Sequence, residues 1–167
     1  MIRHRATAVL LTGALLGTAA AGCGGGGGGA SKGDYQSSLN TFCTDVKGAA
    51  TQVQTDATKL QSNVGSDPKK AIAGFGTTLQ TFADTTRTAL GKLQKTGVPS
   101  DYKTFNDKAV KAFNGVITKL DAAAKGAKSG NIQALSSLGT DLNSVKLPDL
   151  PKDLAKNAKA CGDITSK

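Results

Sequence analysis

The spacing of apolar residues constrains the fold of this chain most, because over long stretches they recur every three or four positions. The first such stripe consists of Tyr35, Leu39, Phe42, Val46, Ala49, Val53, Ala57, Leu60 and Val64. Residues at this spacing share one face of an α-helix, so the stripe predicts a long amphipathic helix. Asp34 is the expected cap at its start, and Gly65 is the expected stop at its end.

Three more stripes of the same kind follow along the chain. Asp67 and Pro68 predict the cap and first position of a second helix, because proline lacks the N–H that would be unpaired there. Ser100 is the expected cap of a third helix, which Ser129 and Gly130 end. A shorter fourth stripe consists of Ile132, Leu135, Leu138, Leu142 and Val145.

The end of the chain predicts a kinked connection over 147–151, where two prolines interrupt the helical pattern. A last short helix is expected over about 152–161. No alternating strand pattern with hairpin turns occurs in the sequence. We therefore predict an all-α fold, an antiparallel four-helix bundle with a short C-terminal helix.

The first 22 residues have the three-part layout of a secretory signal. Arg3 and Arg5 supply a basic start, and the apolar stretch over 6–16 is too short to span a bilayer permanently. A tail of small residues follows, and it leads directly to Cys23.

The sequence Ala20-Ala21-Gly22-Cys23 resembles the bacterial lipobox, where a lipoprotein signal peptidase cuts before a diacylglyceryl-modified cysteine. That family usually has Leu at the place of Ala20. The resemblance implies that Cys23 is the lipid attachment site. The alternative is ordinary signal-peptidase cleavage within 19–21, which would leave Cys23 as an exposed thiol, and a lipid accounts better for a cysteine there.

These features predict a domain organisation of a lipoprotein signal peptide (1–22), a lipidated cysteine with a Gly-rich tether (23–33), and a helical bundle domain (34–167). The six glycines from Gly24 to Gly29 have no side chains that could pack, so a flexible coil is expected. Eleven such residues span on the order of 18 Å. The domain would stay near the membrane without a fixed orientation.

Cys43 and Cys161 remain when Cys23 is assigned to the lipid, and two cysteines in an exported chain predict one disulfide. The bond would close a loop of 118 residues and stabilise the fold by roughly 4 to 5 kcal/mol in the chain-entropy model. The alternative is a pair of buried free thiols.

The chain after residue 22 has 19 basic and 12 acidic residues, a formal charge of +7, and it contains no Glu. Such a chain is attracted to an anionic membrane or wall polymer within a Debye length. The charges are spread along the chain, however. Asp107 and Lys111 have the i,i+4 spacing of an ion pair on a helix face, which favours a solvated face over a dedicated anion site.

The only histidine, His4, lies in the predicted signal peptide. The remaining chain therefore has no residue for a Ser-His-Asp triad, a Cys-His pair or a histidine metal ligand. Without Glu it also lacks the zinc-protease helix motif and the bidentate ligand of a calcium loop. We expect no catalytic, cofactor-binding or metal-binding residues, and no enzyme activity.

Seven aromatic residues on the first three helices either fill the core or line a cavity for a lipid or haem, with tyrosinate as the iron ligand. They are Tyr35, Phe42, Phe75, Phe82, Tyr102, Phe105 and Phe113. Their core spacing favours filling. Nucleic acid is not an expected partner, because an exported chain without an exposed aromatic motif has no access to it.

With its leader, Ala/Gly/Thr-rich composition and helical body, the chain resembles small surface lipoproteins of high-GC Gram-positive bacteria. The resemblance implies a place on the extracellular face of the cytoplasmic membrane, and no particular activity. The favoured function is a non-catalytic interaction or scaffold module whose partner is an anionic envelope polymer or a membrane protein. The alternative is a binding module that holds an apolar small molecule between helices.

Overall fold

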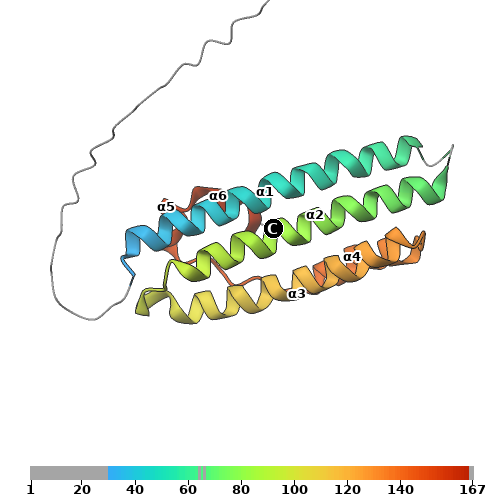
Figure 1. Ribbon diagram of the computed structural model, residues 1–167. Coiled ribbons are helices and arrows are strands. Elements are labelled where there is room, and N and C mark those ends of the chain that lie inside the picture. Colours follow the sequence, from blue (N-terminus) through green and yellow to red (C-terminus); the bar gives the residue numbers. More distant parts are fainter. Residues whose placement is uncertain (1–29, 64, 66, 166–167) are drawn as a thin grey trace, which may run out of the picture.

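The computed structural model describes residues 30–63, 65 and 67–165, and within these ranges every regular element is a helix. The elements are α1 (Lys32–Asn63), α2 (Pro68–Lys95), the 3₁₀ helix η1 (Ser100–Tyr102), α3 (Lys103–Lys128), α4 (Gln133–Asn143), α5 (Lys152–Asn157) and α6 (Lys159–Thr165). Figure 1 shows α2 between α1 and α3. The all-α fold class is confirmed for the described part of the chain.

The shorter helices pack on the two outer members of this row. α4 returns along α3, while α5 and α6 lie against α1 (Figure 1). Among the described helices, α4 packs closely against α3 alone, and it is only 11 residues long. The four-helix bundle is not established by this arrangement and stays a prediction.

The start of α1 differs from the prediction. The backbone N–H of Asp34 donates to Ser31 Oγ at 3.1 Å, and the Ser31 hydroxyl donates to the Asp34 carboxylate at 2.7 Å. Asp34 lies in the first turn, where its charge faces the positive end of the helix. The prediction of Asp34 as the cap is wrong, because Ser31 lies three residues earlier and its hydroxyl accepts the hydrogen bond from a free N–H group of the first turn.

The start of α2 and the end of α3 are as predicted. Asp67 accepts a hydrogen bond from the Lys70 N–H at 3.1 Å, and Pro68 is the first helical residue. α3 ends at Ser129 and Gly130, and Gly130 has a φ of 77°. Glycine adopts this left-handed conformation without steric cost.

The start of α3 is not as predicted. Ser100 opens the 3₁₀ turn η1, and Pro99 stands at the cap position, where no side chain accepts a capping hydrogen bond. The Ser100 hydroxyl points to the carboxylate of Asp101, 3.4 Å away. The predicted Ser100 cap is wrong because the extra turn moves this residue inside the helical segment.

Two helices, α5 and α6, occupy the place of the predicted single C-terminal helix. The helix breaks at Ala158, which has a φ of −106° and a ψ of 62° and is fully buried. The break gives α6 a separate N-terminus, and Asn40 of α1 accepts a hydrogen bond from the Ala160 N–H there at 3.1 Å. Burial of Leu154 and Ala158 against the bundle compensates for the interrupted helix.

The contacts between helices divide the domain into two halves. Ser38 of α1 contacts Thr96, the residue that follows α2, with their hydroxyl oxygens 2.9 Å apart. Thr78 of α2 donates to the carboxylate of Asp56 on α1 at 2.9 Å, and the two contacts show the antiparallel register. We call the half in which the described chain begins the braced half, which consists of residues 30–47, 87–115 and 145–162. The open half consists of residues 48–63, 67–86 and 116–144.

Large side chains fill the space between α1 and α3 in the braced half. The rings of Tyr35 and Tyr102 stack with centroids 5.5 Å apart, and the rings of Phe42 and Phe113 meet edge to face at 4.8 Å. The backbones of α1 and α3 do not approach each other closely, because α2 lies between them. These rings therefore fill the core between the two helices.

The open half has small residues where its helices meet. A Cβ added to Gly76 would lie 2.9 Å from the Ala124 carbonyl oxygen, so this glycine permits α2 and α3 to approach closely. Ala124 and Ala127 of α3 are fully buried beside it. α4 has no buried residue, and Ile132, just before it, is 60% exposed. The core of this half consists of small and aliphatic side chains, such as the fully buried Leu79.

Candidate anion-binding site

The structure describes two of the three predicted site residues. Cys23, the predicted lipid attachment site, lies outside the described residues. Cys43 and Cys161 are brought together at disulfide distance, with their Cα atoms 5.1 Å apart. Both are buried, and the pair joins α1 to α6, as the sequence predicts. The C-terminal segment is thereby attached to the bundle.

The aromatic side chains leave little internal space. A cavity of about 30 Å³ remains where α1, α2 and α3 meet the segment 147–150, and it is lined largely by apolar side chains that include Leu39, Phe42 and Leu90. One water molecule needs about 10 to 15 Å³ of such space. Pockets for drug-sized ligands measure about 300 to 1,000 Å³. A porphyrin or acyl chain has no room in this conformation.

Both tyrosine hydroxyls of the braced half donate a hydrogen bond within the protein. The Tyr35 hydroxyl donates to Asn106 Oδ1 at 3.1 Å, and burial, with a smaller effect of Asp107, raises the pKa of Tyr35 to about 12. The Tyr102 hydroxyl donates to Asp153, and this bond raises the pKa of Tyr102 and lowers the pKa of Asp153. A haem iron would have to displace these hydrogen bonds before it could take either phenol oxygen as a ligand.

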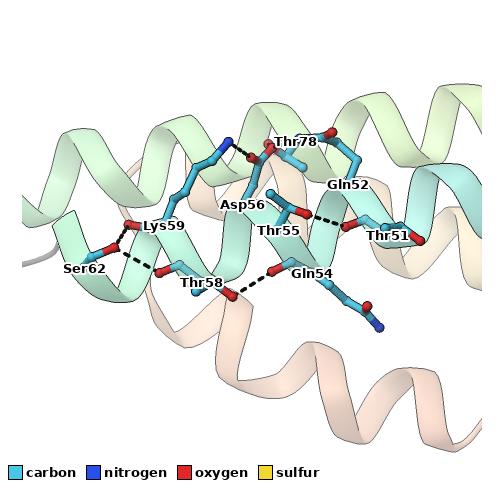
Figure 2. Close-up of polar contacts among 9 residues, drawn as sticks. All are labelled: Thr51, Gln52, Gln54, Thr55, Asp56, Thr58, Lys59, Ser62 and Thr78. Atoms are coloured by element: carbon cyan, nitrogen blue, oxygen red, sulfur yellow. Dashed lines mark hydrogen bonds and ion pairs between the residues drawn. The ribbon is translucent and has the colours of Figure 1, made fainter.

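The carboxylate of Asp56 accepts three polar contacts in the open half, as Figure 2 shows. Gln52 donates at 3.0 Å, Lys59 at 3.0 Å and Thr78 at 2.9 Å, and these bonds hold the pKa of Asp56 at about 2. Four hydroxyls on the same helix donate to carbonyl oxygens one turn earlier, those of Thr51, Thr55, Thr58 and Ser62. The cluster links α1 to α2, and its donors are engaged within the protein.

The ion pair predicted from spacing on α3 does not form. Asp107 pairs with Lys103 at 3.4 Å and not with Lys111. The prediction is wrong because Lys103 also lies four residues from Asp107, on its N-terminal side, and competes for the same carboxylate. The ammonium group of Lys111 therefore forms no ion pair with Asp107.

Lys111 lines a hollow of about 470 Å³ between α3 and the segment 145–148. Two more lysines, Lys108 and Lys146, line the same hollow. The rest of the wall is small or apolar, and it consists of Ala112, Gly115, Val145, Leu147 and Pro148. The three lysines are exposed, and no acidic side chain of the described residues lies within ion-pair distance of them. This basic hollow is the candidate site.

The local fold explains why these lysines meet. Lys108 and Lys111 are three residues apart on α3 and therefore share a face of that helix. Lys146 comes from the chain after α4, which is kept out of helical conformation near Pro148. Further along, the fully buried Leu154 and the disulfide attach this chain to the braced half.

Charge is distributed unequally between the two halves. The braced half has 12 basic and 6 acidic residues, a net charge of +6, whereas the open half has 6 basic and 5 acidic residues, a net charge of +1. The described chain begins in the braced half, where Ala30 lies beside Gly97. A Cβ added to Gly97 would lie 3.1 Å from the Cβ of Ala30. The basic hollow and the start of the described chain therefore share one half.

No metal-binding cluster of three or more acidic, cysteine or histidine side chains occurs in the described ranges. None of the helices within those ranges is sufficiently long and apolar to cross a membrane. In comparisons with known proteins, no family model, no curated protein and no solved structure matches this chain.

Proposed function

We propose that the protein is a non-catalytic interaction module of the cell envelope, attached to the extracellular face of the cytoplasmic membrane by a lipid on Cys23. Its braced half binds an anionic component of the envelope. The observation that carries this proposal is the basic hollow, in which Lys108, Lys111 and Lys146 have no acidic partner among the described residues. Such ammonium groups attract phosphate or carboxylate groups.

The lipid anchor rests on the leader and on the resemblance of 20–23 to the lipobox. Two acyl chains give stable anchoring, because each buried CH₂ contributes about 0.8 kcal/mol and a single chain binds only marginally. Intact mass spectrometry of protein extracted from membranes should find a diacylated chain that begins at Cys23. An unmodified chain recovered from the medium would contradict the anchor.

We also propose that the domain is an antiparallel four-helix bundle with a C-terminal helical appendage. It is supported by the alternating directions of α1 to α4 and by the packing of α4 along α3. Proton–proton contacts between α4 and α1 in solution would establish a closed bundle. Their absence would leave a three-helix bundle with α4 attached on one side.

Binding should depend steeply on salt, since the Debye length falls from about 10 Å at 0.1 M to about 3 Å at 1 M. The test uses a Cys23→Ser chain, which cannot carry the lipid, on phosphatidylglycerol vesicles and on an anionic wall polymer. We expect retention at about 0.1 M salt on at least one of them, and loss at about 1 M. Equal retention on neutral phosphatidylcholine vesicles would contradict the proposal.

The second candidate, a module that holds an apolar small molecule, is favoured only by the cavity of about 30 Å³ in the braced half. The cavity would have to expand to accept a lipid or haem. Organic extraction of the purified protein, followed by mass spectrometry, tests this function. A stoichiometric apolar ligand would support it and would displace the proposal above.

A further inference from the structure

We infer that the basic hollow is a binding site for the phosphate of an anionic lipid headgroup, so that the braced half lies on the membrane surface. The inference rests on the proposed function and specifies its partner. Three features carry it, namely the charge of the hollow, its apolar wall, and its distance from the start of the described chain.

The charge suits a phosphate group. Lys108 and Lys111 approach the hollow from α3, and Lys146 approaches from the opposite wall. A phosphate oxygen accepts hydrogen bonds from several ammonium groups, and lysine binds phosphate as a point charge without a fixed geometry. Each lysine near an anionic membrane contributes about 1 kcal/mol to binding.

The wall between the lysines suits a lipid better than a fully hydrophilic polymer. Val145, Leu147 and Pro148 are half-buried there, and Ala112 and Gly115 leave space beside them. Apolar groups in contact with the glycerol backbone and first methylenes of a lipid would be removed from water. A polymer of charged or hydroxylated units offers no such apolar surface.

The position of the hollow suits a membrane-tethered chain. Lys111 lies eight residues after the start of α3 at Lys103, a distance of about 12 Å along the helix. This end of α3 is also the end at which the described chain begins, since Lys32 forms an ion pair with Asp101. The predicted tether of on the order of 18 Å is long enough to let the hollow reach the headgroups.

The first test compares two triple variants of the Cys23→Ser chain in a flotation assay with phosphatidylglycerol-containing vesicles. The site variant changes Lys108, Lys111 and Lys146 to Gln. The control changes three exposed lysines of the open half to Gln, Lys69, Lys70 and Lys125. Both lose three charges. We expect about 100-fold weaker binding for the site variant and less than about 10-fold for the control.

The second test leaves the charge unchanged. An added Cβ meets no atom within 4 Å at Gly115, in the wall of the hollow, or at Gly139 on α4. Leu is a good helix former, so Gly115→Leu and Gly139→Leu should both fold. We expect Gly115→Leu to weaken vesicle binding about 10-fold by filling the hollow, and Gly139→Leu to leave it unchanged.

Four outcomes would overturn the inference. Equal losses in the two triple variants would show general attraction by net charge, and full binding by Gly115→Leu would show that the hollow is not used. Retention of the Cys23→Ser chain on wall polymer, without binding to vesicles, would exclude the lipid headgroup while leaving the proposed function intact. Retention on neither surface would contradict both.

Discussion

The braced and open halves are built from the same helices but are stabilised in different ways. The braced half has stacked and edge-to-face aromatic rings, the disulfide and the docked α5 and α6. The open half has buried aliphatic side chains such as Leu79 and Leu120 and close alanine and glycine contacts, and among its described residues there is no ring pair and no disulfide. Regions with few buried apolar contacts open more readily. The difference indicates that the braced half is the rigid platform, and the candidate site lies on it.

The largest expected effect comes from removing the disulfide. The Cys43→Ser, Cys161→Ser double variant should lose about 4 kcal/mol of unfolding free energy in urea. The reason is that the unfolded chain is no longer restricted by a bond between residues 118 positions apart. Far-ultraviolet circular dichroism should still report a helical fold. Two alkylatable thiols in the native parent protein would contradict the bond itself.

A single truncation in each half gives the next largest difference. Leu154 is fully buried in the braced half, whereas Leu138 on α4 is half-buried in the open half. We expect Leu154→Ala to lower the unfolding free energy by about 3 kcal/mol and Leu138→Ala by about 1 kcal/mol. Equal losses in urea titrations would mean that the two halves are equally well packed.

The braced half should also be sensitive to high pH through Tyr35. Its pKa is raised from 10.0 to about 12, so above pH 10 the unfolded chain loses this proton before the folded protein does. The contribution is complete below about pH 10 and is lost as the pH rises to about 12, a change of about 2 kcal/mol. Tyr35→Phe should have a smaller fall in unfolding free energy over this interval. An equally steep fall of the unfolding free energy in the variant would show that groups other than Tyr35 cause it.

The smallest effects should have opposite signs at two neighbouring glycines of α2. Gly74 has open space around it, so Gly74→Ala should raise the unfolding free energy by about 0.5 to 1 kcal/mol through helix propensity. Gly76 touches α3, so Gly76→Ala should lower it by about 1 kcal/mol. Thermal melts of the two variants should shift in opposite directions. A stabilising Gly76→Ala would show that α2 and α3 are not tightly packed there.

Helical periodicity was sufficient to predict the three long helices, and the cysteine count was sufficient to predict the disulfide. Both signals are local or depend on counting. The cap of α1 could also have been found, because Ser31 and Asp34 have capping-box spacing. The break at Ala158 could not, since it depends on Asn40 of α1.

The candidate site could not be predicted because it depends on the path of the chain after α4. Lys146 is distant in sequence from Lys108 and Lys111, and nothing local indicates that they meet. The i,i+4 rule also assigned Lys111 to Asp107, although Lys103 competes for that carboxylate. The prolines near 148 predict an irregular segment, but they do not predict that this segment packs beside α3.

Amide hydrogen exchange of the Cys23→Ser chain, with and without an anionic surface, tests most directly whether the braced half makes the contact. Phosphatidylglycerol vesicles and anionic wall polymer are added in turn, at about 0.1 M salt. Our account predicts added protection over 103–115 and 145–150, and none over 48–63 and 133–143. Added protection confined to the open half, or none in either half on a surface that retains the protein, would contradict it.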